Sequence, residues 1–163
     1  MTPELQSALI GLAGGLVGVA IGAMLQHKSS HAQLRRQLTL QFYDRFEATE
    51  LLQSRIAADR LLAANLASPT PKSYSELYAT LPPADWQHIS STRHFFDQLG
   101  VLHEIGYLDI SIARPVFGSY AAYWADHYFD RLEQLEAAYA TSHSKPPMKW
   151  LVPSKKVMQL FQS

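Results

Sequence analysis

The chain has 163 residues, of which 47% are hydrophobic and none is cysteine, and its formal net charge is zero. This length accommodates one compact domain with an appendage, and the lack of cysteine excludes disulfides, thiolate metal sites and cysteine nucleophiles. Residues 37–144 hold seven Lys and Arg against thirteen Asp and Glu, whereas the remaining Lys and Arg all lie in the flanks. An acidic body between two basic ends argues against nucleic acid as a partner.

The first predicted element is a membrane-spanning helix. Residues 8–25, ALIGLAGGLVGVAIGAML, contain no charged residue and no hydrogen-bonding side chain. A helix over 3–26 would be about 36 Å long, enough to cross a hydrocarbon core of ~30 Å. A soluble core helix is one alternative, but such helices are usually amphipathic. A cleaved signal peptide is another, but it needs a basic n-region and a good small-x-small cleavage site.

The flanks of this run predict its orientation, because positive residues favour the cytoplasmic side of a membrane. Lys28, Arg35 and Arg36 follow the run, while only the terminal amine and Glu4 precede it. We therefore expect residues 1–27 to anchor the chain in the cytoplasmic (inner) membrane with the N-terminus outside and the helical domain in the cytoplasm.

Glycines within the run predict close packing against another span. They recur at four-residue intervals as two ridges, and such small-xxx-small ridges let helices approach closely. A monomeric glycine-rich span is the alternative, and a homo-oligomer or another membrane protein is the expected partner. The glycines concerned are Gly11, Gly14, Gly15, Gly18 and Gly22.

Residues 30–67 are predicted to form one long helix, because apolar side chains recur at three- and four-residue steps. Arg55 and Asp59 are expected to pair across one turn on its polar side. Whether this helix continues directly out of the span is left open by the sequence. The expected apolar stripe consists of Leu34, Leu38, Phe42, Phe46, Thr49, Gln53 and Ile56, with Leu52 beside it.

Capping signals divide the rest of the domain, which is expected to be all-α over 28–141. Ser73 and Glu76 form a capping-box pattern, and Pro83 suits the first turn of a helix over 84–105. Gly106 is the expected C-cap of that helix, and Asp109 the N-cap of a short piece over 110–114. A last long helix is predicted over 115–140, with Pro115 restarting or kinking the chain.

Residues 142–163 are predicted to be a basic amphipathic tail. Its apolar side chains could dock on the domain, lie in an anionic lipid surface, or stay disordered or serve a partner. The tail residues that would reach a membrane surface, together with Lys28, Arg35 and Arg36, are Lys149, Trp150, Lys155 and Lys156.

Residues 86–124 contain a recognisable pattern of residues, namely Phe95–Asp97, Leu99–Gly100, Gly106–Asp109, Phe117–Gly118 and Tyr123–Trp124. This pattern resembles an uncharacterised bacterial family of small membrane-anchored helical proteins. The resemblance implies an anchored helical domain and brings no activity with it.

Candidate chemistry is limited to two histidine–carboxylate pairs. His94 and Asp97, and likewise His127 and Asp130, lie one turn apart on predicted helices, so a metal site would form if the pairs converged. Both pairs lie off the apolar stripes, which instead favours solvated edges and ion pairs. Phosphate-binding loops, nucleophile elbows and zinc-protease motifs do not occur in the soluble part, and no cofactor is expected.

These patterns predict a single N-terminal transmembrane helix followed by a small helical bundle. The first hypothesis for function is a non-enzymatic, membrane-tethered interaction or scaffold module. One alternative is a metal-dependent enzyme using the two histidine–carboxylate pairs, and another is a sensor of anionic lipid surfaces that works through the basic ends.

Overall fold

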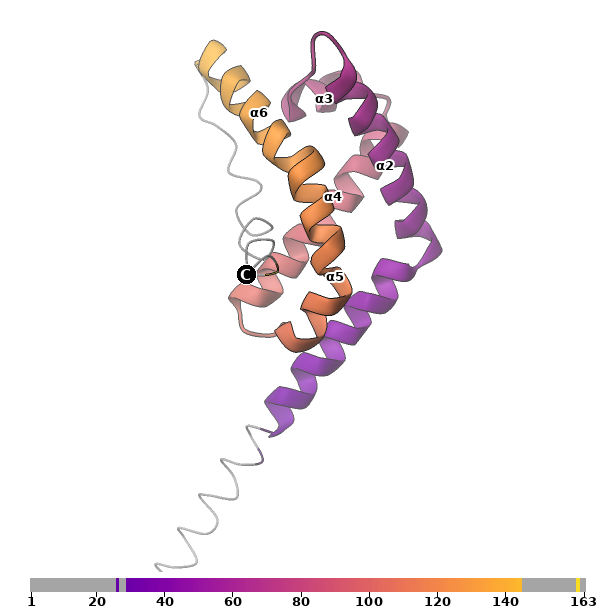
Figure 1. The fold of residues 1–163 in the computed structure, drawn as a ribbon, viewed down its shortest axis with the longest axis vertical. Coiled ribbons are helices and arrows are strands. Elements are labelled where there is room, and N and C mark those ends of the chain that lie inside the picture. The colour runs from indigo at the N-terminus through magenta and orange to yellow at the C-terminus, as the bar shows by residue number, and fades with distance from the viewer. Residues whose placement is uncertain (1–25, 27–28, 145–160, 162–163) are drawn as a thin grey trace, which may run out of the picture.

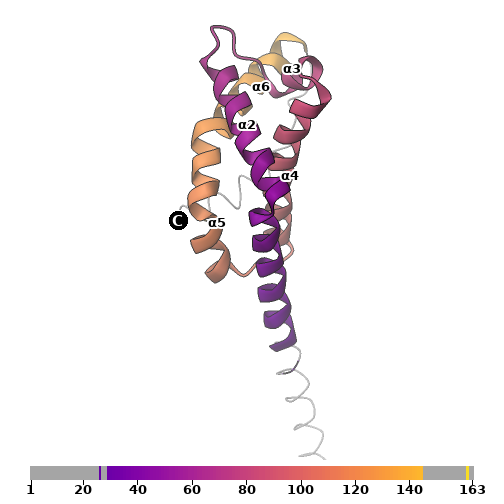
Figure 2. The same ribbon diagram turned by 90° about the vertical axis from the view of Figure 1, so that its right-hand side faces the viewer.

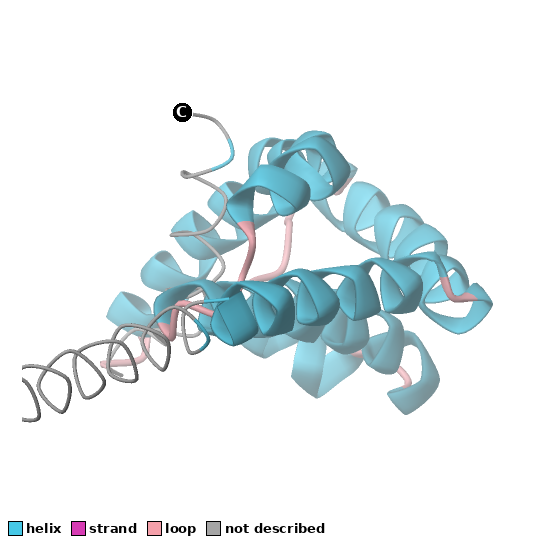
Figure 3. Ribbon diagram, turned by 90° about the horizontal axis from the view of Figure 1, so that it is seen from below, coloured by secondary structure: helices cyan, strands magenta, loops and turns pink. Residues whose placement is uncertain are grey.

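The computed structural model describes residue 26, residues 29–144 and residue 161. Helices and their connecting loops account for all of the described residues (Figure 3), which confirms the all-α prediction. No helix among them combines the length and the hydropathy needed to cross a membrane. The predicted span over 8–25 and its glycine ridges lie outside the described residues.

The predicted long helix over 30–67 is in fact two helices. The first covers 29–47 and the second, α2, covers Thr49–Ala67. Between them Ala48 leaves the helical region, with φ −58° and ψ 135°, and the chain changes direction sharply (Figure 1). The Phe46 carbonyl accepts a hydrogen bond from Arg55 Nη2 at 2.9 Å. A buried guanidinium therefore satisfies a carbonyl group at the break, where the helical ladder is interrupted.

The break changes which face of α2 is buried. A continuous helix would bury Ile56, but this side chain is 47% exposed. Because the extended residue at position 48 rotates the following helix, the predicted stripe is wrong beyond Phe46. It is also wrong at its first residue, because Leu34 is 41% exposed. The residues of α2 that are buried are Leu51, Arg55, Ala58 and Leu62.

Helices α3 (Tyr74–Thr80) and α4 (Pro83–Glu104) start and stop where the capping signals predicted. Ser73 and Glu76 form the complete capping box. Gly106, at φ +74°, ends α4. There the amide N–H of Tyr107 donates to Leu102 and that of Gly106 to His103, which is the Schellman pattern. The loop after α4 is tied to the first helix by the Asp109 amide, which donates to Thr39 Oγ1 at 2.9 Å.

The last part of the bundle is one continuous helical path with a widened turn inside it. It consists of α5 (Ile110–Trp124), the π-helical turn η1 (Ala125–Phe129) and α6 (Asp130–Ser142). The Asp109 side chain accepts from the Ser111 amide as an N-cap, so the predicted short piece over 110–114 is the first part of α5. Pro115 lies within this helix and does not start a new one.

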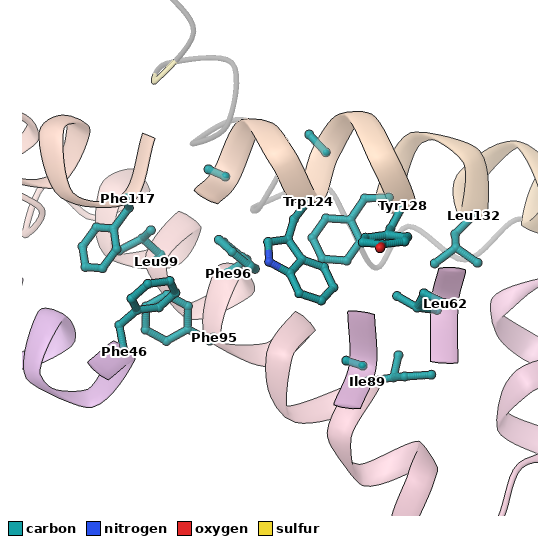
Figure 4. Packing of buried hydrophobic residues seen from close by; sticks show 14 of the residues in the cluster. Phe46, Leu62, Ile89, Phe95, Phe96, Leu99, Phe117, Trp124, Tyr128 and Leu132 are labelled. Atoms are coloured by element: carbon teal, nitrogen blue, oxygen red, sulfur yellow. The ribbon is translucent and has the colours of Figure 1, made fainter. Parts of the chain in front are cut away.

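The core is rich in aromatic side chains and joins all the long helices (Figure 4). Phe46, Phe95, Phe96 and Phe117 are each at most 1% exposed. The Phe46 ring lies 5.0 Å from that of Phe95 and 5.5 Å from that of Phe117, in tilted and edge-to-face arrangements that aromatic pairs favour. Helix α2 packs along α4 beside this core (Figure 2).

Four residues of the predicted tail, 142–144 and 161, are described, and the last of them docks on the bundle. Phe161 is 8% exposed and belongs to the core cluster. Its Cβ lies 3.7 Å from the position that a side chain on Gly118 would occupy. At this residue the chain follows the docking alternative. Lys149, Trp150, Lys155 and Lys156 lie outside the described residues.

Candidate functional site

An open groove lies between α2 and α5. Its volume is about 590 Å³, which falls in the range of small-molecule sites. It is lined by Leu52, Arg55, Ile56 and Asp59 from α2 and by Ser119, Tyr120, Tyr123 and Trp124 from α5.

The walls of the groove are mostly apolar and uncovered. Leu52, Ile56, Tyr120 and Tyr123 are all at least 40% exposed. On α2 this exposure follows from the break at Ala48, which rotates the helix and leaves two large aliphatic side chains outside the core. Exposed apolar side chains gathered in one concave place are typical of binding surfaces.

A carboxylate with two tyrosines lies at this groove. The hydroxyls of Tyr123 and Tyr128 both donate to Asp59 Oδ1, each at 2.6 Å. The two hydroxyls lie 3.3 Å from each other. Two tyrosines, one from α5 and one from η1, thus hold the Asp59 carboxylate of α2 in place.

The π-helical turn explains how both tyrosines reach one oxygen. Tyr123 and Tyr128 are five residues apart, and in a regular α-helix such residues point roughly 140° apart. The wider turn over Ala125–Phe129 reduces this offset. Turns of this kind are frequent at functional sites.

The Asp59 carboxylate forms no ion pair among the described residues. The two ion pairs found there join Arg36 to Asp109 and Arg93 to Asp97, and neither involves Asp59. Burial, with the hydrogen bond to Asp59, raises the pKa of Tyr128 above its ordinary value. Tyr128 is therefore a fixed neutral donor at neutral pH, which suits a binding site better than proton transfer.

Arg55 lines the groove without pairing with Asp59, so the predicted pair across one turn is wrong. Its side chain is turned toward the break, where the guanidinium carbon lies 3.5 Å from the centre of the Phe46 ring. Arg55 is 7% exposed, and burial lowers the pKa of its guanidinium. Its Nε is buried without a hydrogen-bond partner. The groove therefore has a buried cation one helical turn from an accessible carboxylate.

The histidine–carboxylate pairs do not come together. The described residues contain no group of three or more potential metal ligands. Asp97 pairs with Arg93 at 3.3 Å, and His94 is exposed and bonds to Gln98. His127 stacks on Tyr123 with 4.3 Å between the ring centres, and Asp130 is exposed. Of the ion pairs expected at these residues, the one between Asp97 and Arg93 is present.

The predicted membrane-surface arginines take part in the bundle. Arg36 Nε lies 3.6 Å from Asp109 Oδ2, and the Arg36 side chain is 70% exposed. Arg35 is partly buried, and its carbonyl accepts from the Thr39 hydroxyl. Lys28 and the five ridge glycines, Gly11, Gly14, Gly15, Gly18 and Gly22, lie outside the described residues.

Sequence patterns alone missed the groove. Ile56 was expected in the core, and Tyr123 and Tyr128 are not spaced to share a face of an α-helix. The chain matches no protein-family model, no curated protein and no solved structure. Its resemblance to anchored bacterial helical proteins stays a prediction.

Proposed function

We propose that this chain is a single-pass membrane-anchored interaction module, not an enzyme. In this proposal residues 8–25 hold the chain in the bilayer, the glycine ridges assemble spans, and the helical bundle presents its groove in the cytoplasm. The observation that carries the proposal is the run of eighteen residues without a charged or hydrogen-bonding side chain, directly followed by basic residues.

Two features of the described bundle support an interaction role. The first is the uncovered apolar groove between α2 and α5, which is a surface of the kind that partners bind. The second is the lack of a catalytic constellation at that groove, where the tyrosine hydroxyls are engaged as donors to Asp59 and the arginine is engaged by a carbonyl group. The metal-dependent alternative has no grouped ligands to support it among the described residues.

Membrane fractionation tests the anchor. We expect the full-length chain to remain in the membrane pellet after alkaline carbonate treatment. Val17→Arg should move it toward the soluble fraction, because an arginine at the centre of a span costs about 2.5–3.5 kcal/mol. Val17→Ile is the matched control and should stay in the pellet. A wild-type chain found in the soluble pool would refute the anchor.

The lack of cysteine makes the topology directly measurable. A single cysteine introduced as Thr2→Cys should react with a membrane-impermeant maleimide added to intact spheroplasts. Ala63→Cys, at an exposed position of α2, should react only after the membrane is opened. The reverse pattern would place the bundle on the outer side.

Cross-linking in native membranes tests the assembly role of the span. Gly14→Leu with Gly18→Leu should abolish cross-linked dimers, because leucine side chains keep two helices apart at the ridge. Ala13→Leu with Ala20→Leu places the same two leucine side chains on the opposite face of the predicted helix and should leave the dimers in place. An unchanged dimer yield in the glycine variant would exclude the ridge.

A further inference from the structure

We propose that the groove between α2 and α5 binds a small organic cation that carries a single positive charge on an apolar body. The groove itself lies in the bundle, so this inference does not depend on the membrane anchor. Its volume of about 590 Å³ lies in the range of small-molecule sites.

The anchoring group for the cation is the Asp59 carboxylate. Its Oδ1 already accepts two tyrosine hydroxyls at 2.6 Å each, so the carboxylate is positioned before any ligand arrives. Neither of the ion pairs found in the described part of the chain includes it. An ammonium group would supply the opposite charge that this carboxylate lacks, beside the apolar side chains that line the groove.

The surrounding side chains suit an apolar body attached to the charge. Tyr123, which is 40% exposed, lines the groove beside Asp59, and aromatic rings attract organic cations. Leu52 and Ile56 provide exposed aliphatic surface on the opposite wall. A molecule that covers them removes their apolar surface from water, which favours binding.

Arg55 determines how the ligand is oriented in the groove and how many positive charges the ligand can carry. Its guanidinium lies 5.4 Å from the centre of the Tyr120 ring, in the part of the groove nearest the break, so a second cation there would be repelled. An anionic ligand is disfavoured because Arg55 is 7% exposed and bonds to the Phe46 carbonyl. Asp59 is more accessible. The charged end of the ligand therefore lies at Asp59 and the apolar end toward Leu52.

Isothermal titration of the full-length protein with three matched probes tests this inference. The probes are 2-phenylethylammonium, the neutral 2-phenylethanol and the anionic 3-phenylpropionate. We expect saturable binding of the ammonium probe, at least about tenfold tighter than the alcohol, because the charge-assisted contact is worth about 1.5–3 kcal/mol. The anion should bind no better than the alcohol. No saturable binding of the ammonium probe, or tighter binding of the anion, would overturn the proposal.

Two variants locate the site. Asp59→Asn should reduce the affinity for the ammonium probe to that of the alcohol, whereas Glu50→Gln removes an exposed negative charge from the same helix outside this groove and should change it little. Equal losses in both variants would indicate general charge attraction and overturn the assignment. If Asp59→Asn does not fold, Ile56→Trp fills the groove from an exposed position and should abolish binding of all three probes. Unchanged binding in that variant would exclude the groove.

Discussion

The break at Ala48 predicts which of two neighbouring residues, Arg55 or Ile56, contributes more to the stability of the protein. A continuous helix would bury Ile56 and expose Arg55, whereas the observed structure does the opposite. We therefore expect Arg55→Met to destabilise the protein more than Ile56→Ala does. The reverse order is what the apolar spacing of the sequence alone predicts.

The magnitudes follow from the contacts. Arg55 makes a charge-assisted hydrogen bond to the Phe46 carbonyl at 2.9 Å, worth about 1.5–3 kcal/mol. It also lies 3.5 Å above the Phe46 ring, which adds about 2 kcal/mol for a desolvated cation. Methionine loses both contacts but relieves part of the cost of burying a charge, so we expect a net loss of about 1–3 kcal/mol in the free energy of unfolding.

Ile56→Ala should cost less than about 1 kcal/mol, because half-exposed methyl groups gain little from burial. A core isoleucine would cost about 2–5 kcal/mol on the same change. Urea unfolding of the full-length protein, followed by far-ultraviolet circular dichroism, measures both values. A cost above 2 kcal/mol for Ile56→Ala, about the least expected of a core position, with no cost for Arg55→Met would show that the helix continues through Ala48 and that the groove does not exist as described.

Four further changes test other parts of the bundle by the same unfolding measurement. Burial raises the pKa of Tyr74 to about 12. The contribution of this shift to the free energy of unfolding is therefore complete below about pH 10 and is lost as the pH rises toward 12. Tyr74→Phe should reduce the alkaline loss of stability by up to about 2–3 kcal/mol, and an identical alkaline profile would contradict that assignment. Glu136→Ala should cost about 1–3 kcal/mol, because the buried carboxylate accepts from both the amide and the hydroxyl of Ser75; a neutral result would mean that water replaces it. Gly106→Ala should cost about 1 kcal/mol from the positive φ alone, since nothing lies within 4 Å of an added Cβ, and a stabilised variant would be inconsistent with the Schellman cap. Phe161→Ala should cost about 3 kcal/mol, because the side chain is buried in the core. A cost near zero would show that the end of the tail is not docked on the bundle.

The sequence predicted the helix ends well because their signals are local. A capping box needs only Ser73 and a glutamate three residues later, and both of its hydrogen bonds are present. Gly106 likewise ends α4 through bonds that span a single turn. In each case the residues that decide the structure lie within one turn of the helix end, so residues close in the sequence are enough to predict where the helix ends.

The break and the π-helical turn had no such local signal. Neither Pro nor Gly occurs near Ala48, and the group that satisfies the freed carbonyl is nine residues away, on Arg55. The widened turn aligns Tyr123 and Tyr128 with Asp59, which precedes them by more than sixty residues. Both departures from regular helix geometry are stabilised by tertiary contacts, and the apolar periodicity of one segment cannot report such contacts.

These two departures meet at one place, and this coincidence is itself an argument for function. The break turns Leu52 and Ile56 out of the core, and the widened turn directs Tyr123 and Tyr128 to Asp59 on the facing helix. Regular helices would have buried the aliphatic side chains and separated the tyrosines, leaving no groove with an anchored carboxylate. Irregular geometry is normally tolerated where a protein uses it. The groove is therefore the part of the described bundle where binding is expected, and variants that restore regular helix geometry on either side should remove binding before they reduce stability.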